Sequence, residues 1–146
     1  MKEQTNGRLG RAMQAELDGR TRVLLVEDDE AIQGVLLTFL RENGCEVDVA
    51  RDGQEALDLL AGENFDVMVT DLAMPGIGGA DVIDLIRNVG VPLPIVVISA
   101  HVVRQGSEWL RDMGVKHVLA KPFRMGELLS SIEEATAASH ARGTEE

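Results

Sequence analysis

The sequence is poor in aromatic residues and has no tyrosine at all. Three phenylalanines and one tryptophan are present among 146 residues, whereas hydrophobic residues make up 45%. A core must therefore be built mainly from aliphatic side chains. An apolar fraction of this size excludes an intrinsically disordered chain, and the length suits a single domain with its own core.

Cysteine is almost absent, since Cys45 is the only one. A lone cysteine excludes an internal disulfide, which fits a reducing compartment, and we expect a cytoplasmic protein. Cys45 itself is expected to be a small buried hydrophobe beside a strand, with a reactive thiol as the alternative. Apolar runs stay well short of the roughly 18 residues that a membrane span needs. Residues 1–20 lack the apolar centre of a secretory signal.

Basic residues are scarce as well. The chain has 14 Lys and Arg against 25 Asp and Glu, a net charge of -11. We therefore expect no direct binding to nucleic acid, whose phosphates require clustered basic side chains. Residues 1–21 carry four basic and three acidic side chains, which leaves -12 on the remainder. We expect residues 1–21 to form a flexible extension that can include a short helical turn around 9–17.

Short β-branched runs alternate with segments of helical period from residue 22 onward. Strands are predicted at 22–26, around 47–49, and at 65–70, 95–99 and 117–120, and helices at 30–43, from 52, around 82–86, and at 104–113 and 124–139. Almost continuously hydrophobic strands indicate burial on both faces, and right-handed connections then give a parallel sheet between helices. We predict an α/β fold, a flavodoxin-like doubly wound (βα)5 domain with strand order 2-1-3-4-5.

Polar residues mark the expected helix ends. Asp29 is predicted to cap the helix 30–43, and Gly44 to end it. Asp52 with Glu55 three residues later is a capping-box pattern. These signals place helix boundaries independently of the hydrophobic pattern.

Charged and hydroxyl side chains stand where four of the predicted strands end. Glu27 and Asp28 follow the first strand, Asp71 the third and Lys121 the fifth, and Ser99 closes the fourth. The carboxyl ends of parallel strands share one edge, where open α/β folds bind ligands. Clustered carboxylates need a cation to stay ionised, and an all-oxygen site suits Mg²⁺. Each residue alone would be an ordinary strand-end side chain; only their convergence predicts a site.

The chemistry that such an edge favours is phosphoryl transfer. A carboxylate can attack a phosphoryl group to form an aspartyl phosphate, and transfer depends chiefly on positioning and charge neutralisation. Mg²⁺ would supply two positive charges and Lys121 one, while the Ser99 hydroxyl would bind a phosphoryl oxygen.

Four segments resemble the four signatures of the response-regulator receiver domain. They are Leu25-Val26-Glu27-Asp28-Asp29, Val69-Thr70-Asp71-Leu72-Ala73-Met74-Pro75-Gly76, Val97-Ile98-Ser99-Ala100 and Ala120-Lys121-Pro122-Phe123. Their order and spacing match over residues 22–140. The resemblance is to receivers of two-component signalling, and in particular to stand-alone, chemotaxis-type receivers.

The resemblance implies a role for each matching position. Asp71 would be the phosphoacceptor, supplied by a sensor histidine kinase or a histidine phosphotransfer protein. The peptide bond between Lys121 and Pro122 would be cis. Mg²⁺ would be held by Asp28 directly, by Glu27, by Asp71 and by the backbone carbonyl of Ala73, and phosphoryl oxygens by Ser99 and Lys121.

Several positions depart from the family pattern. Val118 stands where receivers usually have a rotating aromatic residue, so we expect signalling without an aromatic switch, and the neighbouring His117 should point to the opposite face. Ala73 has no side chain to orient or block water that attacks the aspartyl phosphate, whereas His101 could do either or have no role. Gly78 replaces the usual Asp or Asn, which predicts a helix without a side-chain cap. Because Gly76, Gly78 and Gly79 are all present, we expect this loop to be mobile.

Trp109 lies in the predicted helix 104–113. We expect it to be a partly buried packing residue. The alternative is a contact on the surface formed by 104–113, 117–120 and 124–139, which receivers use to bind partners, and tryptophan is common in interface hot spots. The same surface would support a homodimer.

The favoured hypothesis is a phosphorylation-dependent binding switch that acts on a downstream protein target. Residues 1–21 would be the extension, 22–140 the receiver and 141–146 a tail whose native character favours a stand-alone receiver over a trimmed regulator. The chain is not expected to be an enzyme beyond catalysing its own phosphorylation and dephosphorylation. One alternative is a phosphate-independent interaction module. A less favoured alternative is a Mg²⁺-dependent phosphatase with an Asp nucleophile. Such enzymes typically have a second Asp two residues after the nucleophile, where this chain has Ala73.

Overall fold

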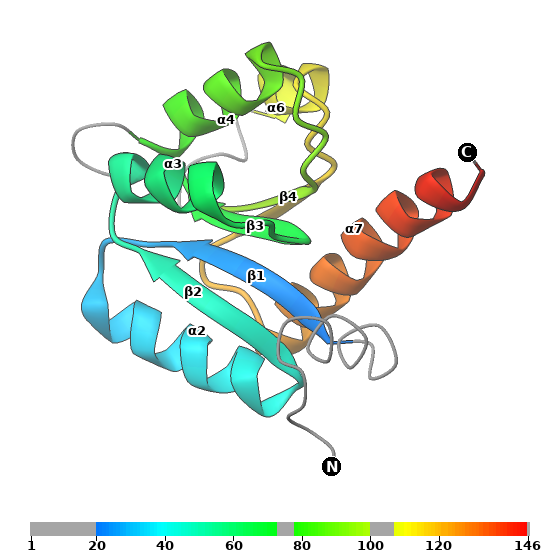
Figure 1. Cartoon of the computed structure of the whole chain (residues 1–146). Helices are drawn as coiled ribbons and strands as arrows, with labels where there is room; N and C mark the ends of the chain where they lie inside the picture. The colour runs from blue at the N-terminus through cyan, green and yellow to red at the C-terminus, as the bar shows by residue number, and fades with distance from the viewer. Residues whose placement is uncertain (1–19, 73–77, 100–106, 146) are drawn as a thin grey trace.

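The computed structural model describes residues 20–72, 78–99 and 107–145, which contain one five-stranded sheet (Figure 1). The strands are β1 (Thr21–Val26), β2 (Cys45–Ala50), β3 (Val67–Asp71), β4 (Ile95–Ser99) and β5 (His117–Ala120). Their order is β2-β1-β3-β4-β5, and every neighbouring pair is parallel. The predicted α/β fold and strand order are confirmed.

Five helices of the described residues cover the two faces of the sheet (Figure 1). One face carries α2 (Glu30–Glu42) and α7 (Met125–Glu145), and the other carries α3 (Gly53–Gly62), α4 (Gly79–Asn88) and α6 (Ser107–Asp112). The last helix continues to Glu145 rather than ending near 139, so the residues expected to form a tail largely extend it. No helix in the described ranges combines the length and apolar character needed to cross a bilayer.

Alternate residues of β1 contribute to two hydrophobic cores, one on each face of the sheet. Leu24 and Val26 pack on the α3–α4–α6 side, and Val23 and Leu25 pack on the α2–α7 side. Both β3 and β4 are buried along their whole length, which explains hydrophobic sequences without alternation. Cys45 is buried on the α2–α7 side, as its sequence context predicts.

The ends of α2 follow the sequence signals. The Asp29 side chain accepts hydrogen bonds from the backbone N–H groups of Ala31 at 2.9 Å and Ile32 at 3.1 Å. Gly44 follows the helix with φ of 91°, a backbone conformation that residues other than glycine rarely adopt. The cap at Asp29 fixes the turn directly after the acidic end of β1.

The starts of α3 and α4 differ from a simple capping box. Asp52 accepts a hydrogen bond from the Glu55 N–H at 2.9 Å, but the Glu55 carboxylate accepts from the backbone of Arg51 rather than Asp52. Gly78 provides no side-chain cap for α4, as predicted. The first turn of α4 instead contributes Asp81, whose carboxylate accepts from the Gly78 N–H at 3.2 Å. The predicted mobility of the preceding loop concerns residues outside the described ranges.

Candidate functional site

The carboxyl edge of the sheet gathers charged and hydroxyl side chains from four adjacent strands. Glu27 follows β1, Asp71 and Ser99 are the last residues of β3 and β4, and Lys121 follows β5. These strands are consecutive neighbours in the sheet, so their ends lie next to one another. The fold alone thus brings these residues to one edge from positions far apart in the chain.

Lys121 makes the central contacts of this edge. Its Nζ donates a hydrogen bond to Asp71 Oδ2 at 2.7 Å and lies 3.6 Å from Glu27 Oε1. Its backbone N–H donates to the Ser99 carbonyl at 2.9 Å, which extends the β4–β5 pairing to the lysine. The Lys121–Pro122 peptide bond is cis, as the resemblance implies. One ammonium group therefore contacts two carboxylates from two other strands.

Both carboxylates are buried, and Glu27 is only 1% exposed. Burial raises the pKa of Glu27 above its ordinary value. A hydrogen bond from the Asp29 backbone and the charge of Lys121 oppose this effect, while the charges of Asp71 and Asp28 add to it. The site thus holds more negative charge than one lysine neutralises.

The Lys121 ammonium responds in the opposite sense to the same environment. Burial by itself would lower the pKa of Lys121. The hydrogen bond to Asp71, the charge of Asp71 and the charge of Glu27 outweigh burial, and the pKa of Lys121 is raised. Lys121 therefore stays positively charged throughout the neutral pH range, as a group that binds phosphoryl oxygens requires.

The acidic side chains fit a hard cation in part. Glu27 Oε1 is buried and accepts no hydrogen bond, whereas Oε2 accepts from the Asp29 N–H at 3.2 Å. A buried carboxylate oxygen without a donor is a suitable ligand for Mg²⁺, which prefers oxygen. The Asp28 side chain is exposed, and no three acidic, His or Cys side chains of the described residues converge on one point. The predicted backbone ligand, Ala73, lies outside the described ranges.

Comparison with known proteins identifies the family. The sequence model of the response regulator receiver domain matches residues 23–133. The chain belongs to the response regulator receiver family. It is 39% identical over 109 residues to the response regulator MprA of Mycolicibacterium vanbaalenii, and 38% identical to the protein of that name from Mycobacterium avium. The matches cover 75% of this chain but only 47% and 48% of those relatives, so this chain spans about half their length.

Solved receiver structures have the same fold. The receiver domain of the Francisella response regulator 1452 is 30% identical and superposes with a TM-score of 0.77 over 82% of this chain and 98% of that domain. The HemR receiver domain of Leptospira biflexa is also 30% identical, with a TM-score of 0.73 over 80% of this chain and 94% of that one. Membership in this family supports a signalling role as a phosphoacceptor.

The receiver position that usually holds an aromatic switch is filled by an inward-facing valine. Val118 packs against the α3–α4–α6 core, whereas Leu119 packs against the α2–α7 core. His117 is turned toward α7, where its Nδ1 lies 3.8 Å from Glu134 Oε1. The expected alternation along β5 is confirmed, and His117 does not substitute for the missing aromatic residue at the Val118 position.

Trp109 is 38% exposed on α6, at the margin between the two predicted roles of packing and partner contact. This receiver therefore has a large, partly exposed aromatic side chain on α6. His101 and Ala73, the two residues proposed to control water, lie outside the described ranges, and their roles stay predictions.

Gly79 is a site residue that the sequence patterns did not single out. It begins α4, and a Cβ atom there would lie 2.1 Å from the carbonyl oxygen of Asp71 and 2.8 Å from Thr70 Oγ1. Only glycine allows the first turn of α4 to approach the backbone of the predicted phosphoacceptor so closely. The signal was present as a run of glycines after Asp71, which suggested mobility rather than a close contact.

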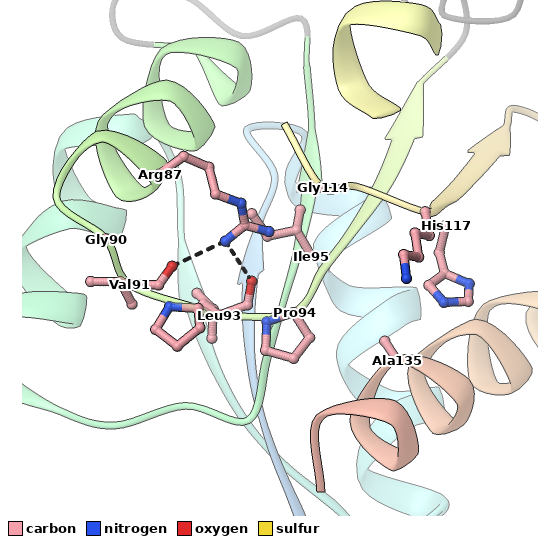
Figure 2. A pocket seen from close by; sticks show the side chains of 11 residues that line it. Arg87, Gly90, Val91, Leu93, Pro94, Ile95, Gly114, His117 and Ala135 are labelled. Carbon is pink, nitrogen blue, oxygen red and sulfur yellow. Dashed lines mark hydrogen bonds between the residues drawn. The ribbon is translucent and has the colours of Figure 1, made fainter. Parts of the chain in front are cut away.

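A separate hollow of about 400 Å³ lies at the opposite edge of the receiver, where β4 and β5 begin (Figure 2). Arg87, Pro94 and His117 are among its lining residues, and none of the predicted site residues is. Arg87 donates hydrogen bonds there to the carbonyls of Val91 and Leu93. This hollow is therefore distinct from the acidic edge, and Arg87 has a structural role in the connection before β4.

Proposed function

We propose that this receiver accepts a phosphoryl group on Asp71 from the phosphohistidine of a sensor histidine kinase or a histidine phosphotransfer protein. The observation that carries the proposal is the contact of 2.7 Å between Lys121 Nζ and Oδ2 of the buried Asp71 at the carboxyl edge of the sheet. A surface ion pair would not need a buried aspartate that is the last residue of a central strand. Family membership supports the same chemistry.

In the proposed step an Asp71 carboxylate oxygen attacks the phosphorus atom. A P–O bond forms while the P–N bond to the donor histidine breaks, and the imidazole nitrogen keeps the electron pair of that bond and takes up a proton from solvent. Lys121 would shift its hydrogen bonds from the carboxylate to a phosphoryl oxygen, and the Ser99 hydroxyl would bind another. Both groups act by positioning and by charge, which is what phosphoryl transfer needs.

The proposed metal ligands are Asp28, Glu27, Asp71 and the backbone carbonyl of Ala73. Mg²⁺ bound there would supply two positive charges next to the transferred group. The buried Glu27 oxygen without a hydrogen bond and the raised pKa of Glu27 support a cation at this place. Asp28 would add a carboxylate from the solvent side, where its side chain is exposed.

The proposed output is a change in partner binding at the face formed by α6, β5 and α7. Ser99 and Lys121 connect the site to this face, because Ser99 ends β4 and Lys121 follows β5. Trp109 on α6 would be the contact residue for a downstream protein target or a second copy of the chain. Val118 implies that the change does not use rotation of an aromatic ring.

Fluorescence of Trp109 tests the proposal, since it is the only tryptophan in the chain. The protein is titrated with beryllium fluoride in the presence of Mg²⁺, alongside an Asp71→Asn variant, while fluorine NMR detects binding at the aspartate. We expect a Mg²⁺-dependent fluorescence change that Asp71→Asn abolishes. Binding without a change would refute the proposed output face. No binding would refute the phosphoacceptor and leave a phosphate-independent interaction module.

A further inference from the structure

An apolar groove of about 430 Å³ lies between α3 and α4, away from the phosphoacceptor site. Its walls include Leu57, Leu60, Phe65, Leu85, Val89 and Val91. Five large hydrophobic residues of the described ranges are exposed, and three of them, Leu85, Val89 and Val91, line this one groove. Val89 is 73% exposed. Isolated exposed hydrophobic residues need no explanation, but a cluster around a hollow indicates a binding surface.

Hydrogen bonds from Arg87 hold one lining segment of the groove in place. Arg87 Nη1 donates to the carbonyl of Val91 at 3.1 Å and to that of Leu93 at 2.9 Å (Figure 2). Its Nε donates to the Met113 carbonyl at 2.7 Å, which ties this connection to the end of α6. The backbone of Val91 and Leu93, one wall of the groove, is therefore held by Arg87.

The chain enters β1 directly beside this groove. Arg22, the second residue of β1, donates hydrogen bonds to the Asn64 carbonyl at 2.6 Å and to Glu63 Oε1 at 2.7 Å. Its guanidinium carbon lies 5.0 Å from the centroid of the Phe65 ring. These three partners line the groove, whereas the other partners of Arg22, which are Asp66, Glu46 and Asp48, do not. The segment before residue 20 therefore joins the described chain two residues before Arg22.

That segment contains a short amphipathic pattern. Leu9, Met13 and Leu17 are spaced four residues apart, which places them on one face of a helix. Residues 11–17 consist only of Arg, Ala, Met, Gln, Glu and Leu, the strongest helix formers. Gly19 follows as a suitable C-terminal end. Such a helix is too short to be stable alone and requires an apolar surface to pack against.

We propose that the N-terminal segment binds in the groove between α3 and α4 of its own chain, as a helix whose Leu9, Met13 and Leu17 face the groove. A helix over 9–17 would be about 13 Å long, and residues 18–20 can span at most about 10 Å to the start of β1. A tether this short gives the segment a high effective concentration at the adjacent groove and favours binding within one chain over exchange between chains. The bound segment would compete with any partner helix that uses the same groove.

Methyl NMR of the 146-residue chain tests the proposal directly. We expect cross-relaxation between the Met13 ε-methyl group and the methyl groups of Leu85 or Val89, and none to Val35, which is exposed on α2. A stripe variant, which combines Leu9→Ser, Met13→Ser and Leu17→Ser, should shift the methyl signals of the groove residues. A matched control variant, Gln4→Ser, Asn6→Ser and Gln14→Ser, should leave them unchanged.

Three results would overturn the proposal. The first is the absence of contacts between Met13 and the groove. The second is an equal response of the groove signals to the stripe and control variants. The third is that the contacts appear only between chains in a mixture of labelled and unlabelled protein, because a second copy would then be the occupant.

Changing the groove provides an independent test that leaves the segment intact. Val89→Asp introduces a charge into the groove. Val35→Asp is the matched control, because it makes the same change on α2 at a residue that is 56% exposed. Both sites are exposed enough for either variant to fold. We expect trypsin to cleave after Arg11 about fivefold faster in Val89→Asp than in the wild type, because cleavage follows the population of the undocked segment. Equal cleavage rates in all three proteins would overturn the proposal.

Discussion

The ammonium group of Lys121 lies 2.7 Å from Asp71 Oδ2 and 3.6 Å from Glu27 Oε1, so one positive charge is shared by two buried carboxylates. This relationship explains two features of the site. It keeps the predicted phosphoacceptor paired, and it leaves one carboxylate charge without a full partner.

Removal of the lysine charge should impair phosphorylation. Lys121→Met retains most of the aliphatic stem but cannot neutralise a phosphoryl oxygen. Loss of one such donor typically costs on the order of 100-fold in rate, and we expect a loss of this size with acetyl phosphate as donor. The rate is measured by intact mass against time. Lys116→Met is the matched control, since Lys116 is exposed. An equal rate in wild type and Lys121→Met would contradict the assigned role.

Glu27→Gln should stabilise the metal-free protein at neutral pH. Burial raises the pKa of Glu27 above its ordinary value of 4.5, so the folded state binds this proton more tightly than the unfolded state. The contribution of Glu27 to stability is then greatest below pH 4.5 and falls as the pH rises toward the raised value. The free energy of unfolding of Glu27→Gln should therefore increase relative to that of the wild type from pH 4.5 up to the raised pKa, and the difference should stay constant at higher pH. Urea unfolding in EDTA measures the difference, and an advantage that shrinks with rising pH would be inconsistent with a raised pKa.

Magnesium should stabilise the wild type and not the Glu27→Gln variant. At neutral pH a ligand that binds only the folded state raises stability by about 2.7 kcal/mol at 100 times its dissociation constant. Thermal unfolding with and without Mg²⁺ measures this effect. Glu46→Gln, an exchange of the same kind on β2, is the control and should respond like the wild type. An undiminished Mg²⁺ effect in Glu27→Gln would remove Glu27 from the ligand set.

Gly79→Ala should destabilise the fold. Its Cβ would lie 2.1 Å from the Asp71 carbonyl oxygen, so the backbone has to move. Overpacking of this kind costs about 1–3 kcal/mol. Gly34→Ala on α2 is the matched control, because a Cβ atom at that position would have no neighbouring atom within 4 Å, and alanine there should stabilise by about 0.5–1 kcal/mol. Urea unfolding of both variants measures these changes. An unchanged free energy of unfolding in Gly79→Ala would refute the close approach of α4 to the Asp71 backbone.

The fold could be predicted because local patterns and long-range order agree in this chain. Continuous hydrophobic runs such as Val67–Val69 identified strands buried on both faces, and alternation with helical segments left few possible sheet orders. Asp29 and Gly44 placed helix ends because their chemistry acts over a few residues. The length of α7 was underestimated, since polar residues after 139 gave no apolar stripe to follow.

The site was only partly predictable. The meeting of Lys121 and Asp71 follows from sheet order alone, because each stands at the end of its strand. The exposure of Asp28 does not follow from sheet order. Adjacent residues at a strand end point in opposite directions, and here the Glu27 side chain points inward and the Asp28 side chain points toward solvent. Gly79 and Arg87 depend on distances between segments, 2.1 Å to a carbonyl in one case and hydrogen bonds to three carbonyls in the other. Sequence patterns contain no measure of such distances.

The most direct test of the central claim is the intact mass of the protein after incubation with acetyl phosphate and Mg²⁺. Wild type, Asp71→Asn and wild type in EDTA are compared under the same conditions. We predict the mass of one added phosphoryl group on the wild type, none on Asp71→Asn, and a strongly reduced amount in EDTA. A wild-type chain that gains no phosphoryl group, or an Asp71→Asn chain that gains as much as the wild type, would contradict the assignment of Asp71 as the phosphoacceptor.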